Sequence, residues 1–260
     1  MRSDERNERK GMIARVSDVM AAFNADEPVL RVSEIARRTG LAKSVTSRIV
    51  ADLLEVDFLE PAGKGVRVGI RMFELGELAQ RSKELRQLAL GAMADLRQAT
   101  GLTVQLSVLK DTDQVYVEIL RGRGGAAQLE IKSRIGGRVP AYATAGGKAV
   151  LAALPDDEIE RVLSGPLEKL GPGTITDPVT LRRQIAQIRN DGVAYEIEES
   201  NPGVTCAAAA ILRADRSPLA AISVTGPSAE INVKVFGIAV QTAALGLNRR
   251  IRASSAFSDL

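Results

Sequence analysis

The chain has 260 residues, of which 45% are hydrophobic and 26% charged, a composition typical of a folded globular protein with one or two domains. The formal net charge of +3 is too small to indicate a binding partner by itself. There is no histidine and only one cysteine, Cys206. An intrachain disulfide, a multi-cysteine zinc site, any histidine-ligated metal site and catalysis through an imidazole base are therefore excluded.

The N-terminal residues 1–10 are charged and contain no apolar signal region. The apolar runs of the chain are too short to span a bilayer. We therefore expect a cytoplasmic protein with no membrane partner, no catalytic or metal site and no cofactor. Residues 1–10 are expected to form a mobile arm, and a one-sided apolar pattern predicts a first helix from about Arg9 to Asn24.

The stretch Val32–Asp57 predicts two short helices joined by a tight turn, in which Gly40 supplies the left-handed geometry that ends the first helix. In the second helix, Val45, Ile49 and Leu53 recur every four residues and predict its inner face. The residues expected on its outer surface are Lys43, Ser44, Thr46, Ser47 and Arg48. A helix in the DNA major groove needs such residues, because hydroxyls reach phosphates and base edges while cations reach phosphate oxygens or guanine.

Charge placement favours DNA binding over the alternative, a helical hairpin that serves only as a packing unit. Residues 31–48 contain five basic residues and one acid, whereas residues 1–76 contain 13 basic and 12 acidic residues. The basic character is local, as expected for a DNA-facing surface.

A β-hairpin is predicted after the second helix, with short strands at Phe58–Glu60 and Val66–Val68 around a loop that contains two glycines. The cations Lys64, Arg67 and Arg71 lie here within eight residues and without an acid. The alternative is an ordinary hairpin with solvated charges. Directly after a recognition helix, however, a basic hairpin is typical of the wing of a winged helix-turn-helix, which contacts flanking phosphates.

After the wing, a helical pattern predicts a linker helix at residues 72–84 and then a second domain at residues 85–253. A polar break at Ser82–Glu84 favours this division over one long coiled-coil-like helix. From Gly101 onward, alternating apolar and polar residues predict strands between helices, among them one at Leu129–Arg134. Strands and helices mixed in this way indicate an α+β fold with a mostly antiparallel sheet.

In their order and spacing, several segments resemble the IclR (isocitrate-lyase-regulator) family of transcriptional regulators. They are SEIARRTGLAKSVTSRIVADL, the hairpin ending in RVG, VPAYATAGGKAVLAAL, YEIEESNPGVTCAAAAI and PLAAISVTGP. The resemblance implies a winged helix-turn-helix at residues 9–71, the linker helix, and a GAF-like effector-binding α/β domain at residues 85–253. It also implies homodimers or homotetramers that act on partly palindromic double-stranded DNA operators, with a small organic acid as the effector.

By similarity to the family's pocket for small organic acids, the effector-binding residues are Ala145, Gly146, Glu196, Cys206, Ser223 and Thr225. Ala145 and Gly146 stand where the chain enters a helix, so exposed N–H groups and the helix dipole favour an anion there. Ser223 and Thr225 lie two apart in a predicted strand, so their hydroxyls point to the same face. We expect these groups to hold the effector's carboxylate.

The same positions also have ordinary structural interpretations: two glycines before a helix often serve chain entry, and a cysteine with apolar neighbours is usually a core residue. The acids at residues 196–199 can form a solvated edge. The sequence departs from the family at Tyr142, where His or Ser is common, at Glu196, where Asp is usual, and at Ala42, a common proline position. The identity of the effector therefore does not carry over.

A ligand-responsive transcriptional regulator is the leading hypothesis, in which the effector biases the placement of two DNA-reading heads. One alternative is a structural DNA binder without an effector. The other is an enzyme fused to a winged helix, with Cys206 as its nucleophile. The enzyme is disfavoured because the chain has no histidine to act as base and no evident cation near Cys206 to stabilise a thiolate.

Overall fold

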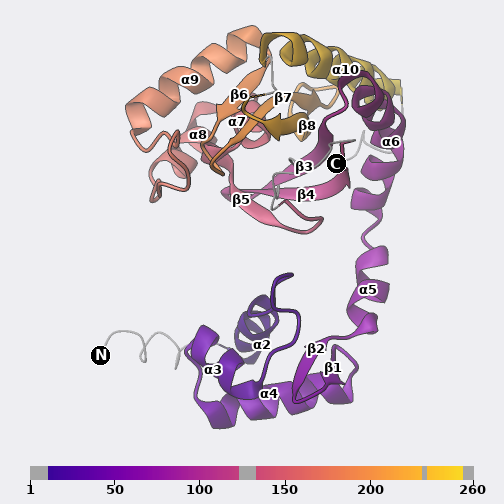
Figure 1. The fold of residues 1–260 in the computed structure, drawn as a ribbon, viewed down its shortest axis with the longest axis vertical. Helices are drawn as coiled ribbons and strands as arrows, with labels where there is room; N and C mark the ends of the chain where they lie inside the picture. The colour runs from indigo at the N-terminus through magenta and orange to yellow at the C-terminus, as the bar shows by residue number, and fades with distance from the viewer. Residues whose placement is uncertain (1–10, 123–132, 230–232, 254–260) are drawn as a thin grey trace. The chain divides into compact units, whose positions relative to one another are not determined.

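The structure is a computed structural model that describes residues 11–122, 133–229 and 233–253 (Figure 1). The chain divides into two compact units, Met1–Gln80 and Arg81–Leu260. The arm expected at residues 1–10 and most of the strand expected at Leu129–Arg134 lie outside the described residues. No helix in the described ranges is long and apolar enough to cross a membrane.

The first unit has the order of elements expected for a winged helix-turn-helix. Its elements are α2 (Met12–Ala21), α3 (Val32–Thr39), α4 (Lys43–Glu55), β1 (Leu59–Ala62), β2 (Gly65–Val68) and α5 (Ile70–Glu77). Gly40 ends α3 in the left-handed conformation with a φ of 67°, as predicted. The inner face of α4 is also confirmed, because Ile49 and Leu53 are buried and Val45 packs against the same core.

The wing is pinned to the loop that precedes α3. Its strands β1 and β2 pair antiparallel around a two-residue turn, Gly63–Lys64, which is tighter than the predicted loop. Leu30 exchanges two backbone hydrogen bonds with Val66, at 2.9 and 2.8 Å. Gly65 permits this approach, because a Cβ there would lie 2.5 Å from the carbonyl oxygen of Leu30. The wing therefore has a fixed place beside the helices of its own unit.

The second unit is an α+β domain, which confirms the expected fold class. Its elements are α6 (Gln80–Thr100), β3 (Thr103–Lys110), β4 (Asp113–Leu120), β5 (Arg138–Pro140), η1 (Ala141–Ala143), α7 (Ala145–Leu151), α8 (Asp156–Leu163), α9 (Pro178–Asp191), β6 (Ala194–Ile197), β7 (Val204–Leu212), β8 (Pro218–Pro227) and α10 (Val233–Ala253). The strands form one sheet in the order β5-β4-β3-β8-β7-β6, and every pairing in it is antiparallel.

Helices cover both faces of this sheet (Figure 1). On β7, Ala207 packs in a core with α6 and α10, whereas the next residue, Ala208, packs in a second core with α7, α8 and α9. This follows from the two-residue period of a strand, which sends successive side chains to opposite faces. The small side chains of β7 allow α7 and α10 to lie close to its two faces.

The break between α5 and α6 lies at Leu78–Ala79 and not at Ser82–Glu84, so the predicted break is wrong. The last turn of α5 closes with bonds of the three-residue type, from the N–H of Leu78 to Leu75 and from that of Ala79 to Gly76, each at 3.1 Å. Glycine in a helix costs roughly 1 kcal/mol relative to alanine, so Gly76 weakens the last turn of α5. The polar residues 82–84 continue α6, because charged and hydroxyl side chains are tolerated within a helix.

Candidate functional site

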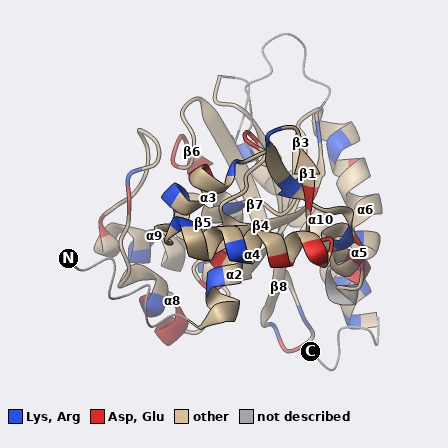
Figure 2. Cartoon of the chain, turned by 90° about the horizontal axis from the view of Figure 1, so that it is seen from below, with Lys and Arg blue, Asp and Glu red and all other residues tan. Residues whose placement is uncertain are grey.

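Helix α4 presents its first turns outward in the first unit. Four of the predicted DNA-binding residues are exposed there: Lys43, Ser44, Ser47 and Arg48. The acids of the helix, Asp52 and Glu55, lie in its last turns, and Figure 2 shows blue toward the beginning of α4 and red toward its end. The first half of α4 thus combines cations, hydroxyls and the positive end of the helix dipole, the groups that phosphates and base edges require.

Thr46 does not belong to this outer surface, contrary to the prediction. Its side chain is fully buried, and its hydroxyl donates to the carbonyl of Ala42 at 3.1 Å. With 3.6 residues per turn, position 46 lies on the same side of the helix as Ile49 and Val50, which are buried. The Thr46 hydroxyl therefore satisfies itself within the helix and is not available to DNA.

The two predicted wing residues, Lys64 and Arg67, differ in their surroundings. Lys64 is exposed in the turn between β1 and β2. Arg67 is exposed as well, but its Nε donates to the carboxylate of Glu60 at 2.5 Å across the strand pair. Because an exposed ion pair contributes only about 0–1 kcal/mol, Arg67 can exchange Glu60 for a phosphate at small cost.

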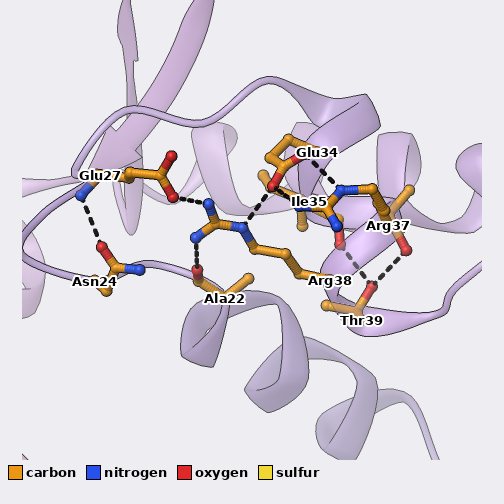
Figure 3. Close-up of polar contacts among 9 residues, drawn as sticks. Ala22, Asn24, Glu27, Glu34, Ile35, Arg37, Arg38 and Thr39 are labelled. Carbon is orange, nitrogen blue, oxygen red and sulfur yellow. Dashed lines mark hydrogen bonds and ion pairs between the residues drawn. The ribbon is translucent and has the colours of Figure 1, made fainter.

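Two cations of the basic stretch 31–48 are neutralised by acids of the same unit. The guanidinium of Arg38, only 19% exposed, donates to Glu27, to Glu34 and to the carbonyl of Ala22 (Figure 3). Arg37 donates to both carboxylate oxygens of Glu34, at 2.9 and 2.6 Å. The bonds from Arg37, and then from Arg38, lower the pKa of Glu34 from 4.5 to about 2. This cluster holds α3 against the end of α2, so the positive surface rests on α4 and the wing.

The second unit contains a cavity of about 260 Å³ on the sheet face that packs against α7. Its inner wall is made by five buried residues: Gln105, Tyr116, Val204, Cys206 and Thr225. Its rim is made by partly or fully exposed polar residues: Ser133, Arg138, Ser200 and Asn201. The strand register brings the inner wall together, because Thr225 pairs with Cys206 while Gln105 pairs with Ser223.

Gln105 is the centre of the polar network in the inner wall, and it was not among the predicted site residues. Its Oε1 accepts from the hydroxyls of Ser223 at 3.2 Å and Thr225 at 3.0 Å. Its Nε2 donates to Ser133 at 2.7 Å, and the Thr225 hydroxyl lies 3.0 Å from the sulfur of Cys206. The structure therefore unites three of the predicted effector residues through one glutamine.

Glu196 is the cross-strand partner of Cys206 and does not line the cavity itself. It is 1% exposed, and one of its oxygens accepts from the N–H and the hydroxyl of Ser200, at 2.9 and 2.6 Å. Burial, and then the charge of Glu196, raise the pKa of the Cys206 thiol well above its usual value. Cys206 is therefore a protonated wall residue, which is the opposite of an activated thiolate.

Ala145 and Gly146 belong to a different cluster and do not line the cavity. The N–H of Gly147 donates to Thr144 Oγ1 and to Gln114 Oε1, each at 3.0 Å. A Cβ on Gly146 would lie 2.4 Å from Gln114 Nε2, so this glycine makes room for the glutamine. Side chains of the chain itself thus occupy the N–H of Gly147 and the space beside Gly146, and the expected carboxylate contact at Ala145 and Gly146 stays a prediction.

A buried ion pair lies next to these elements, and sequence reasoning did not identify it. Lys148 in α7 is fully buried, and its Nζ donates to Glu199 at 2.6 Å and to Gln184 at 3.0 Å. Burial lowers the pKa of Lys148 and raises that of Glu199, and each partner opposes the shift of the other. The pair ties α7 to the turn that brings Ser200 and Asn201 to the rim of the cavity.

The missed residues differ in how much signal the sequence carried. Gln105 and Ser107 alternate with apolar residues in TVQLSVL, which marks a polar face on that strand. Arg138 and Lys148 carried no such signal, because their partners lie far away in the chain. Across residues 11–122, 133–229 and 233–253, no group of three or more His, Cys, Asp or Glu is placed to hold a metal ion.

Two family models match the chain: "IclR helix-turn-helix domain" at residues 12–63 and "Bacterial transcriptional regulator IclR C-terminal" at residues 78–247. The HTH-type transcriptional regulator XynR of Escherichia coli is 29% identical over 245 residues, which are 92% of this chain and 96% of that protein. The transcriptional repressor IclR of Escherichia coli is 30% identical over 219 residues, which are 82% of this chain and 80% of that protein.

The fold also matches solved structures. The crystal structure of an IclR homolog from Microbacterium hydrocarbonoxydans, complexed with 4-hydroxybenzoate, superposes with a TM-score of 0.83 at 32% identity, covering 94% of this chain and 100% of that one. The crystal structure of the Thermotoga maritima IclR superposes with a TM-score of 0.70 at 25% identity, covering 92% of this chain and 98% of that one.

Proposed function

The chain belongs to the IclR family of bacterial transcriptional regulators, and on that premise we propose that its first unit binds an operator and its second unit binds a small carboxylate that modulates this binding. The observation that carries the proposal is the exposed cationic first half of α4, set beside a basic wing in the segment that matches the helix-turn-helix model. The relatives named above are transcriptional regulators.

In this proposal, α4 is the recognition helix. Ser44 and Ser47 contact base edges, and the phosphate contacts come from Lys43, Arg48, Lys64 and Arg67. Residues 9–71 serve as the DNA-binding domain, residues 72–84 as the linker and residues 85–253 as the effector domain. The protein acts in the cytoplasm as a homodimer or homotetramer, because a partly palindromic operator needs two heads related by symmetry.

The DNA-binding part is tested by selecting and sequencing genomic fragments bound by the full chain, followed by affinity measurements on the selected site. Lys43→Gln and Arg48→Gln should each weaken binding on all sequences and reduce the slope of log K against log salt by about 1. Ser44→Ala should relax sequence preference without this change in slope. Glu55→Gln, at the acidic end of α4, is the matched control. If operator affinity and salt slope are unchanged in all variants, α4 is not the reader.

The effector is proposed to occupy the 260 Å³ cavity. This volume lies below the roughly 300–1,000 Å³ of pockets for drug-sized ligands, which points to a small molecule. Polar groups line both its rim and its inner wall, which suits an organic acid. The 4-hydroxybenzoate bound by the Microbacterium homolog supports the same class of ligand, without identifying this protein's effector.

The effector part is tested by calorimetric titration of small carboxylic acids and by repeating the operator-binding assay in their presence. The double variant Ser223→Ala/Thr225→Val should abolish the effector response and leave DNA binding intact. Thr205→Val is the matched control, because it removes a buried hydroxyl from the opposite face of β7. Unchanged effector affinity in the double variant would contradict the assignment, and ligand-insensitive operator affinity would favour a structural DNA binder.

We propose a regulator without catalytic activity. The sole cysteine, Cys206, is held as a thiol by burial and by the neighbouring Glu196, so it is a poor nucleophile. Turnover of any of the candidate acids by the purified protein would contradict this.

A further inference from the structure

We propose that Arg138 anchors the carboxylate of the effector at the rim of the cavity, while the opposite, uncharged end of the effector reaches Gln105 and Thr225 at the inner wall. The inference rests on the proposed function of the cavity as the effector site. It places a charged acid-binding group on strand β5, and it sets the orientation in which the ligand binds.

Among the described residues, Arg138 is the one charged side chain that lines the cavity. The remaining polar groups of the lining are amides, hydroxyls, the Tyr116 phenol and the Cys206 thiol. Burial raises the pKa of both Tyr116 and Cys206, which keeps them uncharged. A carboxylate leaving water needs a charged partner, and a guanidinium can meet it with two parallel hydrogen bonds.

The guanidinium of Arg138 makes one ion pair and has further N–H donors for a ligand. Its Nη1 lies 3.3 Å from a carboxylate oxygen of Asp113, and the two side chains are 49% and 31% exposed. An exposed pair of this kind contributes only about 0–1 kcal/mol. Asp113 therefore orients the side chain of Arg138, and a ligand carboxylate can bind the guanidinium together with Asp113, or in its place, at little cost in free energy.

The Cys206 side of the cavity is unfavourable for an anion. Glu196 is the cross-strand partner of Cys206, and its carboxylate accepts from Ser200 and raises the pKa of the Cys206 thiol. A second carboxylate placed there would be repelled, because like charges destabilise one another. The nearby cation Lys148 is already paired with Glu199 at 2.6 Å. The charges of Arg138 and Glu196 thus favour an acid that binds with its carboxylate at Arg138 and away from Cys206.

The inner wall suits an uncharged polar group. Gln105 and Thr225 are 3% and 2% exposed and offer an amide and a hydroxyl, which both donate and accept hydrogen bonds. The Tyr116 ring forms a flat part of the same wall. The volume of about 260 Å³ limits the ligand to a small molecule. The ligand class is therefore a compact acid, with a carboxylate at one end and a hydroxyl or carbonyl at the other.

The test measures acid and amide pairs on the full chain by calorimetry. The probes are acetate, lactate, benzoate and 4-hydroxybenzoate, each with its primary amide. In the wild type, the tightest-binding acid should have an affinity about 10- to 100-fold higher than that of its amide. This is the range expected for a hydrogen bond to a charged group. Arg138→Gln should reduce the acid to the affinity of its amide and leave the amide unchanged. Arg138→Lys should give an intermediate value, because it keeps the charge but loses the planar fork.

Arg161→Gln is the matched control. Arg161 is also an exposed arginine of the second unit, 3.6 Å from Glu158, but it does not line this cavity. Its substitution should leave every affinity unchanged. If Arg138→Gln leaves the ratio of acid to amide affinity intact, or if the wild type binds acids and amides equally, Arg138 is not the anchor while the cavity remains an effector site. If no acid of the panel binds the wild type, the effector part of the proposed function fails as well.

Discussion

Replacing Lys148 by methionine should strongly destabilise the second unit. The side chains of Lys148 and Glu199 are 0% and 6% exposed and lie 2.6 Å apart. The other oxygen of Glu199, Oε2, is buried and has no hydrogen-bond partner among the described residues. Lys148→Met would leave this carboxylate buried without its cation, and breaking a buried pair in this way costs about 3–5 kcal/mol.

Removing both charges should be much less harmful. In the double variant Lys148→Met/Glu199→Gln neither charge of the pair remains, and we expect its free energy of unfolding to lie within about 1–2 kcal/mol of the wild-type value. The two single changes are therefore strongly non-additive, because they act on one contact.

The loss of stability in Lys148→Met should also depend on pH. Burial raises the pKa of Glu199, and Lys148 opposes that shift, so the pKa rises further when Lys148 is removed. A group whose folded pKa exceeds its unfolded value binds more protons in the folded state, so stability is lost as pH rises above the unfolded value. The single variant should consequently be closer to the wild type at pH 5 than at pH 8, and the double variant should show no such dependence.

Urea unfolding followed by tyrosine fluorescence measures this unit selectively. The chain has three tyrosines and no tryptophan, and Tyr116, Tyr142 and Tyr195 all lie in the second unit. Equal m-values among variants would show that the same surface unfolds in each. A cost below about 1 kcal/mol for Lys148→Met, or a deficit that does not change between pH 5 and pH 8, would refute the reasoning from the buried pair.

Three further predictions concern the first unit. The carboxyl of Glu34 should titrate near pH 2 by carbon NMR, and a midpoint near 4.5 would contradict the geometry. Because its folded pKa lies below 4.5, the stabilisation from its arginine bonds is present above pH 4.5 and is lost as pH falls toward 2. Gly65→Ala should lower the stability of this unit by about 1–3 kcal/mol, measured by helical circular dichroism, because the added Cβ meets a backbone carbonyl oxygen at 2.5 Å. Gly76→Ala is the control, because it lies inside α5 with nothing within 4 Å of the added Cβ and should not lower stability. Thr46→Val should change the unfolding midpoint but not the preference for a DNA sequence. Ser47→Ala should instead relax that preference in competition assays. The reverse pattern would show that the buried and exposed faces of α4 are misassigned.

Most of the DNA-binding unit can be predicted from the sequence alone, because the signals that define it are local. The apolar repeat of α4, the glycine that ends α3 and the tight turn of the wing each depend on a few consecutive residues. The prediction for Thr46 is wrong for a local reason too. A hydroxyl side chain suits the outer face, but the angular position of residue 46 on the helix places it on the inner face. The charge of the surface was less predictable, since Arg38 finds Glu27 through the fold.

The cavity cannot be predicted from the sequence alone, because it depends on how the strands are arranged in the sheet. Alternation along a strand predicts which residues share a face, but it does not predict which strands become neighbours. Gln105, Arg138, Cys206 and Thr225 come from four strands, and they meet only because β3, β5, β7 and β8 take their places in one curled sheet. The same holds for Lys148: α7 buries it, and Glu199, 51 residues later in the chain, supplies its counter-charge.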